Sequence, residues 1–418
     1  MTTKHKGAAA WQLFIAFSFI GLLAAACWIW AGEPWEVLAD GKHYMAMYMG
    51  QPTAPPFAYR VLTPWLAHLL PWSPEFNFGV VTVACLSLAT GFIALFAHQS
   101  GLPTRGVAVM CLLWVTSFAF VYYDTTRIRA DAPMFLMMAV LFCVAKYGVS
   151  TLWLGIVLSI GCLSHETMLV GLAALCVDKL FSTNLMAGAK RHLVGLVALG
   201  ATALALLFVV RHVVATVPAV DPSYIDGPRA MAQFTLNYSG GGVKHVLRIY
   251  AAFGPALVYA LLFLASSTPS RERWGFGALF TLAVSATFLA TDTLRVMAIV
   301  IVPVSFHAAR FVERIWDQRG APWAVALVAF QLAYAWLVYG HLRTFKGSHA
   351  MNVQAAALSG LSVAVALWAL WRARSRTQGT LTRPHAQSVN RLRFGDRIRL
   401  VRPSSGTDTR KAAHGGLS

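Results

Sequence analysis

Charged residues are scarce in this sequence. Asp, Glu, Lys and Arg make up 12% of its 418 residues, while hydrophobic residues make up 57%. A soluble domain needs a more strongly charged surface, so the composition excludes that class. The short alternating segments of a transmembrane barrel are missing too, because apolar windows of roughly 20 residues recur from Trp11 almost to Trp371. These runs predict an all-α, polytopic membrane protein.

Cysteine is also rare, with six residues in the chain. All of them fall inside the expected helices and none has CxxC spacing, so neither a disulfide framework nor a cysteine-based metal site is indicated. The sequence contains no HExxH, GxSxG, P-loop or dinucleotide-binding fingerprint. Zinc proteolysis, serine hydrolysis and nucleotide-driven chemistry therefore have no support in the sequence.

What the sequence does contain is a long series of apolar helices. We expect about 12 transmembrane or half-membrane helices, at residues 11–30, 77–97, 104–122, 132–148, 151–164, 167–182, 192–211, 247–266, 274–291, 295–310, 322–340 and 353–371. Most Lys and Arg residues then fall on one side, which the positive-inside rule assigns to the cytoplasm, together with both termini. The net charge of +18 reflects this topology and gives no reason to expect nucleic acid as a partner.

The expected organisation is one transmembrane domain, residues 1–371, with two long outer loops at residues 31–76 and 212–246. Both loops are too long for plain connectors, so we expect them to fold back over a site as lids or amphipathic segments. From residue 372 to residue 418 the composition turns basic and polar. This segment is expected to be a disordered cytoplasmic tail.

Four groups of ionisable residues interrupt the apolar pattern on the outer side. The first lies in "DGKHYMAMYMGQPTAPPFAYRVLTPWL", where prolines separate two segments and predict a short helix, a turn and an interfacial helix. The others are "YYDTTRIRADAP", "SHETML" and "DTLRV", each at the end of an expected helix. The candidate site residues in these groups are Asp40, Lys42, His43, Tyr44, Arg60, Asp124, Arg127, Asp131, His165, Glu166, Asp292 and Arg295.

Three of the groups also have simpler interpretations. The first fits a solvated loop, the second fits local ion pairs or an N-cap by Asp131, and the fourth fits a surface pair of Asp292 and Arg295. His165 and Glu166 are harder to explain in this way, because ionisable groups at membrane depth are costly to bury and usually face a cavity. Together the groups bring carboxylates suited to general-base catalysis, and arginines suited to phosphate, to one membrane face.

This arrangement resembles the bacterial branch of the integral-membrane glycosyltransferases of the GT-C superfamily. The resemblance covers about Trp11 to Gly340 and depends on "DGKHY", "PPFAYRVLTPWL", "SHETML" and "DTLRVMAIVIVP". It implies inverting transfer of a sugar from a polyprenyl-phosphate donor to a glycan or lipid-linked acceptor, at the periplasmic face of the bacterial inner membrane. It assigns the catalytic base to Asp40. The family often has two adjacent acids there, whereas Gly41 follows Asp40 in this chain, which leaves open whether Mg²⁺ or Mn²⁺ takes part.

On this hypothesis Asp40 deprotonates an acceptor hydroxyl, while His165 and Glu166 orient hydroxyl groups of the sugar or the acceptor. The candidates for stabilising the departing phosphate are Arg60 and Arg295, with Arg127 or Lys42. Two other classes stay open: a transporter or flippase for a lipid-linked saccharide or an organic anion, and an assembly subunit without chemistry. Transporters commonly have internal repeats and ionisable or helix-broken sites near the midplane, whereas here the ionisable groups gather at one face.

Overall fold

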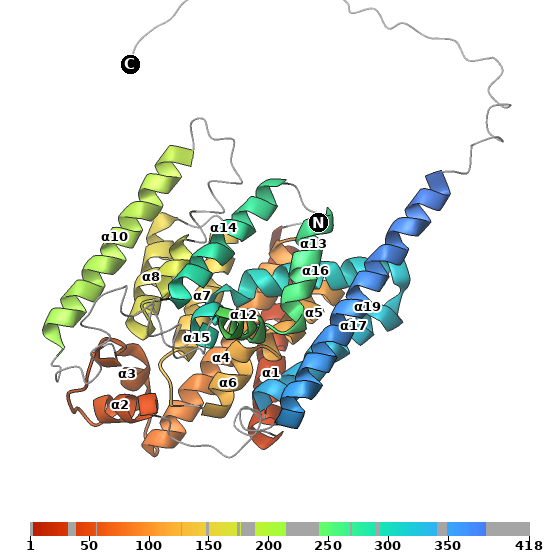
Figure 1. Ribbon diagram of the computed structural model, residues 1–418. Coiled ribbons are helices and arrows are strands. Elements are labelled where there is room, and N and C mark those ends of the chain that lie inside the picture. The colour runs from red at the N-terminus through yellow and green to blue at the C-terminus, as the bar shows by residue number, and fades with distance from the viewer. Residues whose placement is uncertain are drawn as a thin grey trace, which may run out of the picture. The chain divides into compact units, whose positions relative to one another are not determined.

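In the computed structural model every described element is a helix, as the sequence predicts (Figure 1). The structure describes residues 3–31, 39–55, 57–126, 128–147, 150–173, 176, 189–214, 242–267, 270–288, 293–340 and 349–381. The first half holds α1 (Thr3–Ala31), α2 (Ala39–Tyr48), η1 (Phe57–Tyr59), α3 (Leu62–His68), α4 (Pro74–Gln99), α5 (Thr104–Val115), α6 (Phe118–Thr126), α7 (Ala132–Tyr147), α8 (Thr151–Ser164) and α10 (Ala189–Val213). The second half holds α12 (Gly242–Ala251), α13 (Pro255–Ser267), α14 (Ser270–Thr287), α15 (Thr293–Met297), η3 (Ala298–Val300), α16 (Ile301–Arg319), α17 (Ala321–Tyr334), the π-helix η4 (Ala335–Gly340) and α19 (His349–Leu381).

Four of the described helices are long and apolar enough to cross a membrane: Ala9–Trp30, Pro74–Gln99, Leu294–Arg319 and Ala321–Tyr339. Two bent pairs raise the number to six if each pair is one span. The remaining apolar helices are shorter, at Ala132–Lys146, Thr151–Ser164, Val197–Val210 and Val353–Ala369. The chain therefore has the helices of a membrane protein, with four to six candidate spans in its described part where the sequence predicted about 12 transmembrane or half-membrane helices.

Two helices that were predicted as continuous are broken, so that part of the prediction is wrong. The predicted helix 104–122 consists of α5 and α6, which meet at 49°, and the predicted helix 247–266 consists of α12 and α13, which meet at 89°. At the second break Gly254 has a φ of +59°, and Pro255 begins the next helix. A glycine in this left-handed conformation followed by a proline ends one helix and starts another.

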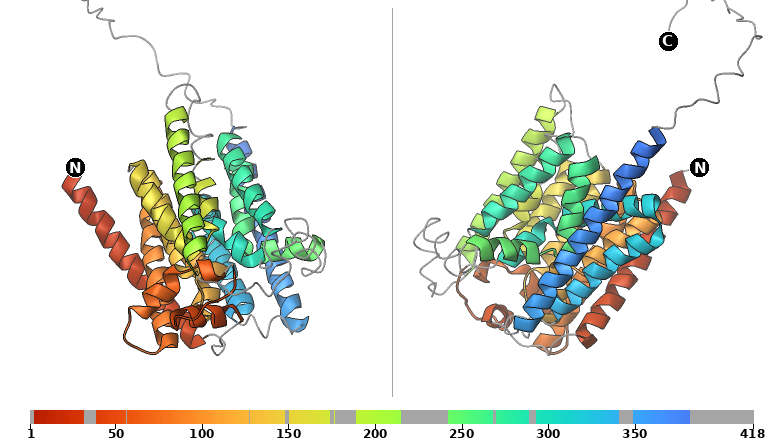
Figure 2. Two further views of the ribbon diagram at one scale, coloured as in Figure 1. Left: turned by 90° about the vertical axis from the view of Figure 1, so that its left-hand side faces the viewer. Right: turned by 45° about the vertical axis from the view of Figure 1, so that its right-hand side comes forward.

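Neighbouring helices form two packed groups within the unit Met1–Ala373. In the first group α4 contacts α1 and α7, and α8 contacts α7 and α10, as the views in Figure 2 allow the reader to follow. In the second group α16 contacts α13 and α17. α16 also contacts α5, the helix that follows α4 in the chain, and this contact joins the two groups. Fully buried aromatic side chains such as Phe78, Trp114 and Phe311 belong to the shared core. The other unit, Arg374–Ser418, is described only up to residue 381, where it is helical.

The segment predicted as the first outer loop contains, in its described part, a short helix, a turn and a second short helix, as the sequence predicts. These elements are α2, η1 and α3, and α3 leads directly toward α4. Ser73 caps α4, because its side chain accepts a hydrogen bond from the backbone N–H of Phe76, and Pro74 occupies the first turn. Of the segment predicted as the second outer loop, residues 215–241 lie outside the described residues.

Candidate active site

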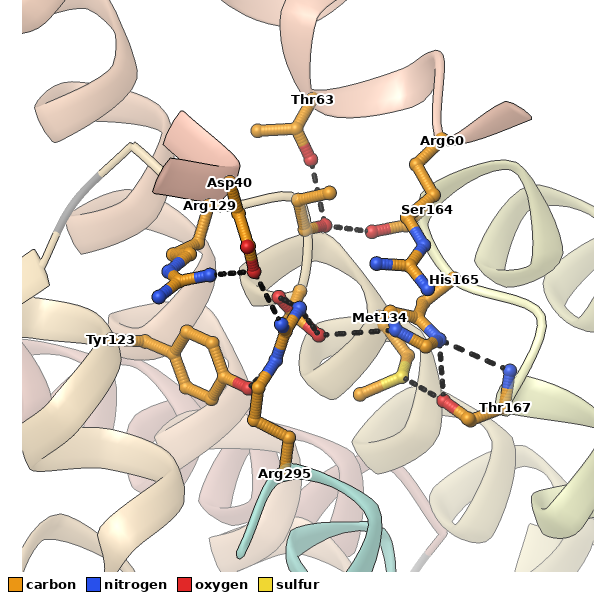
Figure 3. Close-up of polar contacts among 12 residues, drawn as sticks. Asp40, Arg60, Thr63, Tyr123, Arg129, Met134, Ser164, His165, Thr167 and Arg295 are labelled. Atoms are coloured by element: carbon orange, nitrogen blue, oxygen red, sulfur yellow. Dashed lines mark hydrogen bonds and ion pairs between the residues drawn. The ribbon is translucent and has the colours of Figure 1, made fainter. Parts of the chain in front are cut away.

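Five separate parts of the chain bring ionisable side chains together at one place (Figure 3). They are α2, the residue after η1, the non-helical segment 128–131 between α6 and α7, the residues that follow α8, and α15. The carboxylates and guanidinium groups that meet there are those of Asp40, Arg60, Arg129, Asp131, Glu166 and Arg295, with His165 among them. We call this set the ionic cluster.

Arg295 lies at the centre of the ionic cluster and uses all three of its nitrogen atoms. Its Nη1 donates to Oδ2 of Asp40 at 2.7 Å, and its Nη2 donates to Oδ2 and Oδ1 of Asp131 at 2.8 and 3.1 Å. Its Nε donates to the hydroxyl of Tyr123 at 3.1 Å. One guanidinium therefore ties α15 to α2, to the start of α7 and to α6. Such planar, multidentate pairing is the geometry for which arginine is suited.

Arg129 supplies a second guanidinium to the same carboxylate oxygen of Asp40. Its Nη1 pairs with Oδ2 of Asp40, and its Nη2 donates to the hydroxyl of Tyr122 at 2.8 Å. The Arg129 side chain is 6% exposed, whereas that of Asp40 is 26% exposed. Within the described part of the chain, Nε of Arg129 has no hydrogen-bond acceptor. Arg129, which is buried, and Arg295, whose side chain is 10% exposed, thus converge on a partly exposed carboxylate, and Arg129 keeps an unused donor.

Asp131 is the most deeply buried acid in these ion pairs, with a side chain that is 2% exposed. Burial alone raises the pKa of a carboxyl group, but the facing guanidinium of Arg295, with further positive charge from Arg60, outweighs burial and lowers the pKa of Asp131. Asp131 is therefore a carboxylate at neutral pH. The sequence left open whether it pairs with a neighbouring arginine or caps α7, and its carboxylate pairs instead with Arg295, from a distant part of the chain.

His165 is a neutral imidazole between two acids. Burial, with the nearby positive charge of Arg60, lowers the pKa of His165 from 6.5 to about 4. Its Nδ1 accepts the backbone N–H of Thr167 at 3.2 Å and lies 2.8 Å from the hydroxyl of the same residue. Because Nδ1 is an acceptor, the proton of the neutral ring is on Nε2, which lies 3.5 Å from Oδ1 of Asp131. The ring thus directs an N–H toward Asp131.

Glu166 and Arg60 form a second arm of the ionic cluster. Nη2 and Nε of Arg60 donate to Oε1 and Oε2 of Glu166 at 2.7 and 3.2 Å, and Nη1 donates to the hydroxyl of Tyr44 at 3.1 Å. Burial alone raises the pKa of Glu166, but this bidentate pairing with Arg60 outweighs it and holds the pKa well below its usual range. Two of the three nitrogens of Arg60 therefore bind Glu166, whereas Arg129 and Arg295 pair with Asp40.

The segment 128–131 owes its position to two hydroxyl groups. The backbone carbonyl of Ala130 accepts a hydrogen bond from the hydroxyl of Thr63 at 2.8 Å and another from the hydroxyl of Ser164. A non-helical segment inside a membrane protein needs such partners, because its backbone groups lack the usual helical ones. α3 and the end of α8 therefore hold the segment that carries Arg129 and Asp131.

Lys42, His43 and Asp124 are described as well but are not members of the ionic cluster as defined above. Lys42 is exposed on α2, and the ring of His43 stacks on Phe57 at 4.4 Å while its Nδ1 lies 2.7 Å from the hydroxyl of Thr53. Asp124 is fully buried on α6. Arg127 and Asp292 lie outside the described residues.

The sequence did not single out Arg129, Tyr122 or Tyr123 as site residues. All three stand in the "YYDTTRIRADAP" group, whose aromatic pair and closely spaced arginines were the available signal. No group of three or more His, Cys, Asp and Glu residues in the described part of the chain is placed to hold a metal ion. The arginines take up the carboxylates of the cluster, so these residues do not fit a site for Mg²⁺ or Mn²⁺.

Comparison of the sequence with protein-family models finds no match, and comparison with curated proteins finds none either. Function is therefore inferred from the chemistry of the ionic cluster and from the sequence motifs that form it.

Proposed function

We propose that this chain is a membrane glycosyltransferase that moves a sugar from a polyprenyl-phosphate donor to a hydroxyl group of a cell-envelope acceptor, with inversion at the anomeric carbon. The catalytic base is Asp40. The ionic cluster then lies at the periplasmic face of a bacterial inner membrane. There a polyprenyl chain remains in the hydrocarbon while its phosphate and sugar enter a polar site.

The observation that carries this proposal is the convergence of Arg129 and Arg295 on Oδ2 of Asp40. A base for the acceptor hydroxyl and donors for the leaving phosphate must lie within a few ångströms of each other, and this triad supplies both. Asp40 is the member of the triad with the most access to a ligand, since its side chain is 26% exposed.

The reaction uses the triad in the following way. A phosphate oxygen of the donor takes the place of Oδ2 of Asp40 on the two guanidinium groups, and the spare Nε of Arg129 offers a further donor. The freed carboxylate of Asp40 takes the proton of the acceptor hydroxyl, whose oxygen attacks the anomeric carbon. The bond from carbon to phosphate oxygen breaks, its electron pair leaves with the lipid phosphate, and the arginines stabilise the charge that develops there.

The residues around Asp40 and the pair of Arg60 and Glu166 then have different roles. Asp131 and Tyr123 hold Arg295 in place, and Tyr122 holds Arg129. Arg60, which the sequence assigned to the phosphate, is a support for Glu166 in this proposal, because two of its nitrogens already bind that carboxylate. Glu166 remains available to accept hydrogen bonds from sugar or acceptor hydroxyls.

The experiment that tests the proposal is transfer by the purified protein from radiolabelled polyprenyl-phosphate sugars. Asp40→Asn is expected to lower the rate by roughly 10²- to 10⁴-fold, the usual contribution of a general base, without lowering the amount of folded protein. The control is Glu75→Gln, which also replaces a carboxylate by its amide. Glu75 lies in the first turn of α4, outside the ionic cluster, so this variant is expected to keep wild-type turnover. Wild-type turnover in Asp40→Asn would refute the assignment.

A transporter or flippase for a lipid-linked saccharide or an organic anion is the second candidate, and the two broken helices favour it. Broken helices often bind substrates in transporters through freed backbone groups. Here freed carbonyl groups at the breaks already have side-chain partners, since Trp28 donates to Val115 at 2.9 Å and Tyr339 donates to Ala251 at 2.6 Å. Flux of labelled lipid-linked saccharide across sealed vesicles, without product formation, would select this candidate over the enzyme.

A further inference from the structure

The two helix breaks leave backbone groups that need partners inside the protein. At the first break Thr116 follows α5 as its C-cap, and the carbonyl of Thr116 has lost its helical partner, the N–H four residues on, because the N–H of Phe120 bonds to Ser117 instead. At the second break Ala256 lies in the first turn of α13, where an N–H has no helical acceptor. Both helices belong to bent pairs that are apolar enough to span a membrane, so water is a poor substitute partner.

One side chain serves both breaks. Nε2 of Gln331, on α17, donates to the carbonyl oxygen of Thr116 at 3.2 Å, and Oε1 of the same amide accepts the N–H of Ala256 at 3.0 Å. Gln331 is 1% exposed. The orientation of the amide follows from its partners, since a carbonyl requires a donor and an N–H requires an acceptor. Trp28 and Tyr339, by comparison, each donate to a carbonyl at a single break.

Each broken helix is connected through side-chain or helix contacts to the arginines of the proposed phosphate site, Arg129 and Arg295. Beyond the first break, α6 carries Tyr122 and Tyr123, whose hydroxyls hold Arg129 and Arg295 respectively. Beyond the second break, α12 packs against α15, which carries Arg295. A shift of α6 relative to α12 therefore changes the position of Arg295, on α15, relative to Arg129, which Tyr122 of α6 holds.

We propose that Gln331 is a positioning residue, which locks the two broken helices together and thereby sets the spacing of the arginine pair that receives the donor phosphate. The amide touches neither substrate nor reacting atoms and acts through α6 and α12. Its effect on catalysis depends on the proposed glycosyl transfer, whereas the tie between the two breaks is independent of any activity.

Hydrogen exchange measures the tie directly in the full-length protein. Gln331→Leu removes both hydrogen bonds, so exchange at Ala256 is expected to become about tenfold faster or more, the effect of losing one buried hydrogen bond. Leu332→Ala, at an exposed neighbour on the same helix, is the control and is expected to exchange as the wild type does. Wild-type protection of Ala256 in Gln331→Leu would overturn the inference even if the wild-type protein transfers no sugar.

Gln331→Glu separates positioning from general damage to the fold. A protonated carboxyl group has one donor and one acceptor, like the amide, and can bond Thr116 and Ala256 in the same way, whereas an ionised one cannot donate. The rate of transfer relative to wild type is therefore expected to be high at low pH and to fall as pH rises. In Gln331→Leu, kcat/KM is expected to be lower by roughly tenfold or more at every pH. A ratio for Gln331→Glu that does not change with pH would overturn the inference, because only the protonated carboxyl group can donate to Thr116 and so hold the two breaks together.

Discussion

His165 offers the sharpest test of the electrostatics of the ionic cluster. A single substitution can remove its contribution to the pH dependence of the free energy of unfolding. Burial, reinforced by Arg60, lowers the pKa of His165 from 6.5 to about 4 in the folded protein. In the unfolded chain the imidazole keeps its ordinary pKa and binds a proton more readily. The free energy of unfolding is therefore unaffected by this group above pH 6.5, decreases as the pH falls, and levels off below about 4.

The size of the effect follows from the shift. The pKa falls by about 2.5 units from 6.5 to about 4, and each unit corresponds to ~1.4 kcal/mol. The protein is thus expected to lose about 3 kcal/mol of stability through this group as the pH falls across that window. The carboxyl groups of Asp131 and Glu166 titrate below their ordinary pKa values of 3.8 and 4.5 in the folded protein, so most of their contribution is lost below pH 4. The part that is lost above pH 4 is common to wild type and a variant that changes only His165.

The assay compares unfolding free energies of wild type and His165→Gln in mixed micelles between pH 7.5 and 4, followed by tryptophan fluorescence. Glutamine can accept the N–H of Thr167 and donate to Asp131, as the neutral imidazole does, but it does not titrate. We expect the decrease between pH 6.5 and 4 to be smaller in this variant by the stated amount. His68→Gln, at an exposed histidine of α3, should keep the wild-type pH dependence. Equal pH dependence in wild type and His165→Gln would refute the neutral, buried state of His165.

Two further predictions concern the backbone around the site. Gly254→Ala should destabilise the protein by about 2–4 kcal/mol, because φ is +59° and an added Cβ lies 2.5 Å from the ring of Tyr334. Gly50→Ala, where φ is +72° and the space is open, should cost only about 1 kcal/mol; equal losses in unfolding free energy would contradict this account. Ser164→Ala should cost about 1 kcal/mol, and adding Thr63→Val should cost more than the sum of the two single changes, since each hydroxyl compensates for loss of the other on a shared carbonyl. Strict additivity in a double-mutant cycle would contradict that coupling.

The sequence predicts the helical class and most helix positions because apolar runs determine them locally. It also predicts that acids and arginines from the first loop, the "RIRADAP" segment, "SHET" and "DTLR" belong together, and Asp40, Asp131, Glu166 and Arg295 do meet. The partner of each residue was not predictable. Arg295 and Asp40 are 255 residues apart in the chain, and no local spacing relates them. The expected phosphate role of Arg60 overlooked its bidentate pairing with Glu166 for the same reason.

Of the two helix breaks, one could be predicted from the sequence and the other could not. The "FGPAL" stretch at the second break contains a glycine and a proline, which are recognisable signals for a break. The first break, at Thr116 and Ser117, has no such signal within its apolar run. It depends on partners elsewhere in the chain, namely the indole of Trp28 and the amide of Gln331. Such a break becomes apparent only when tertiary contacts are known.

The long separation between Asp40 and Arg295 also has a consequence for biosynthesis. Synthesis of the 255 residues between them takes about 13 to 50 s at ordinary translation rates. Arg129 emerges earlier, 89 residues after Asp40, so the nascent chain passes through a stage in which Asp131 lacks its arginine partner. A ribosome-bound chain that stops before residue 295 should therefore be recognised and degraded more readily than one that stops shortly after it.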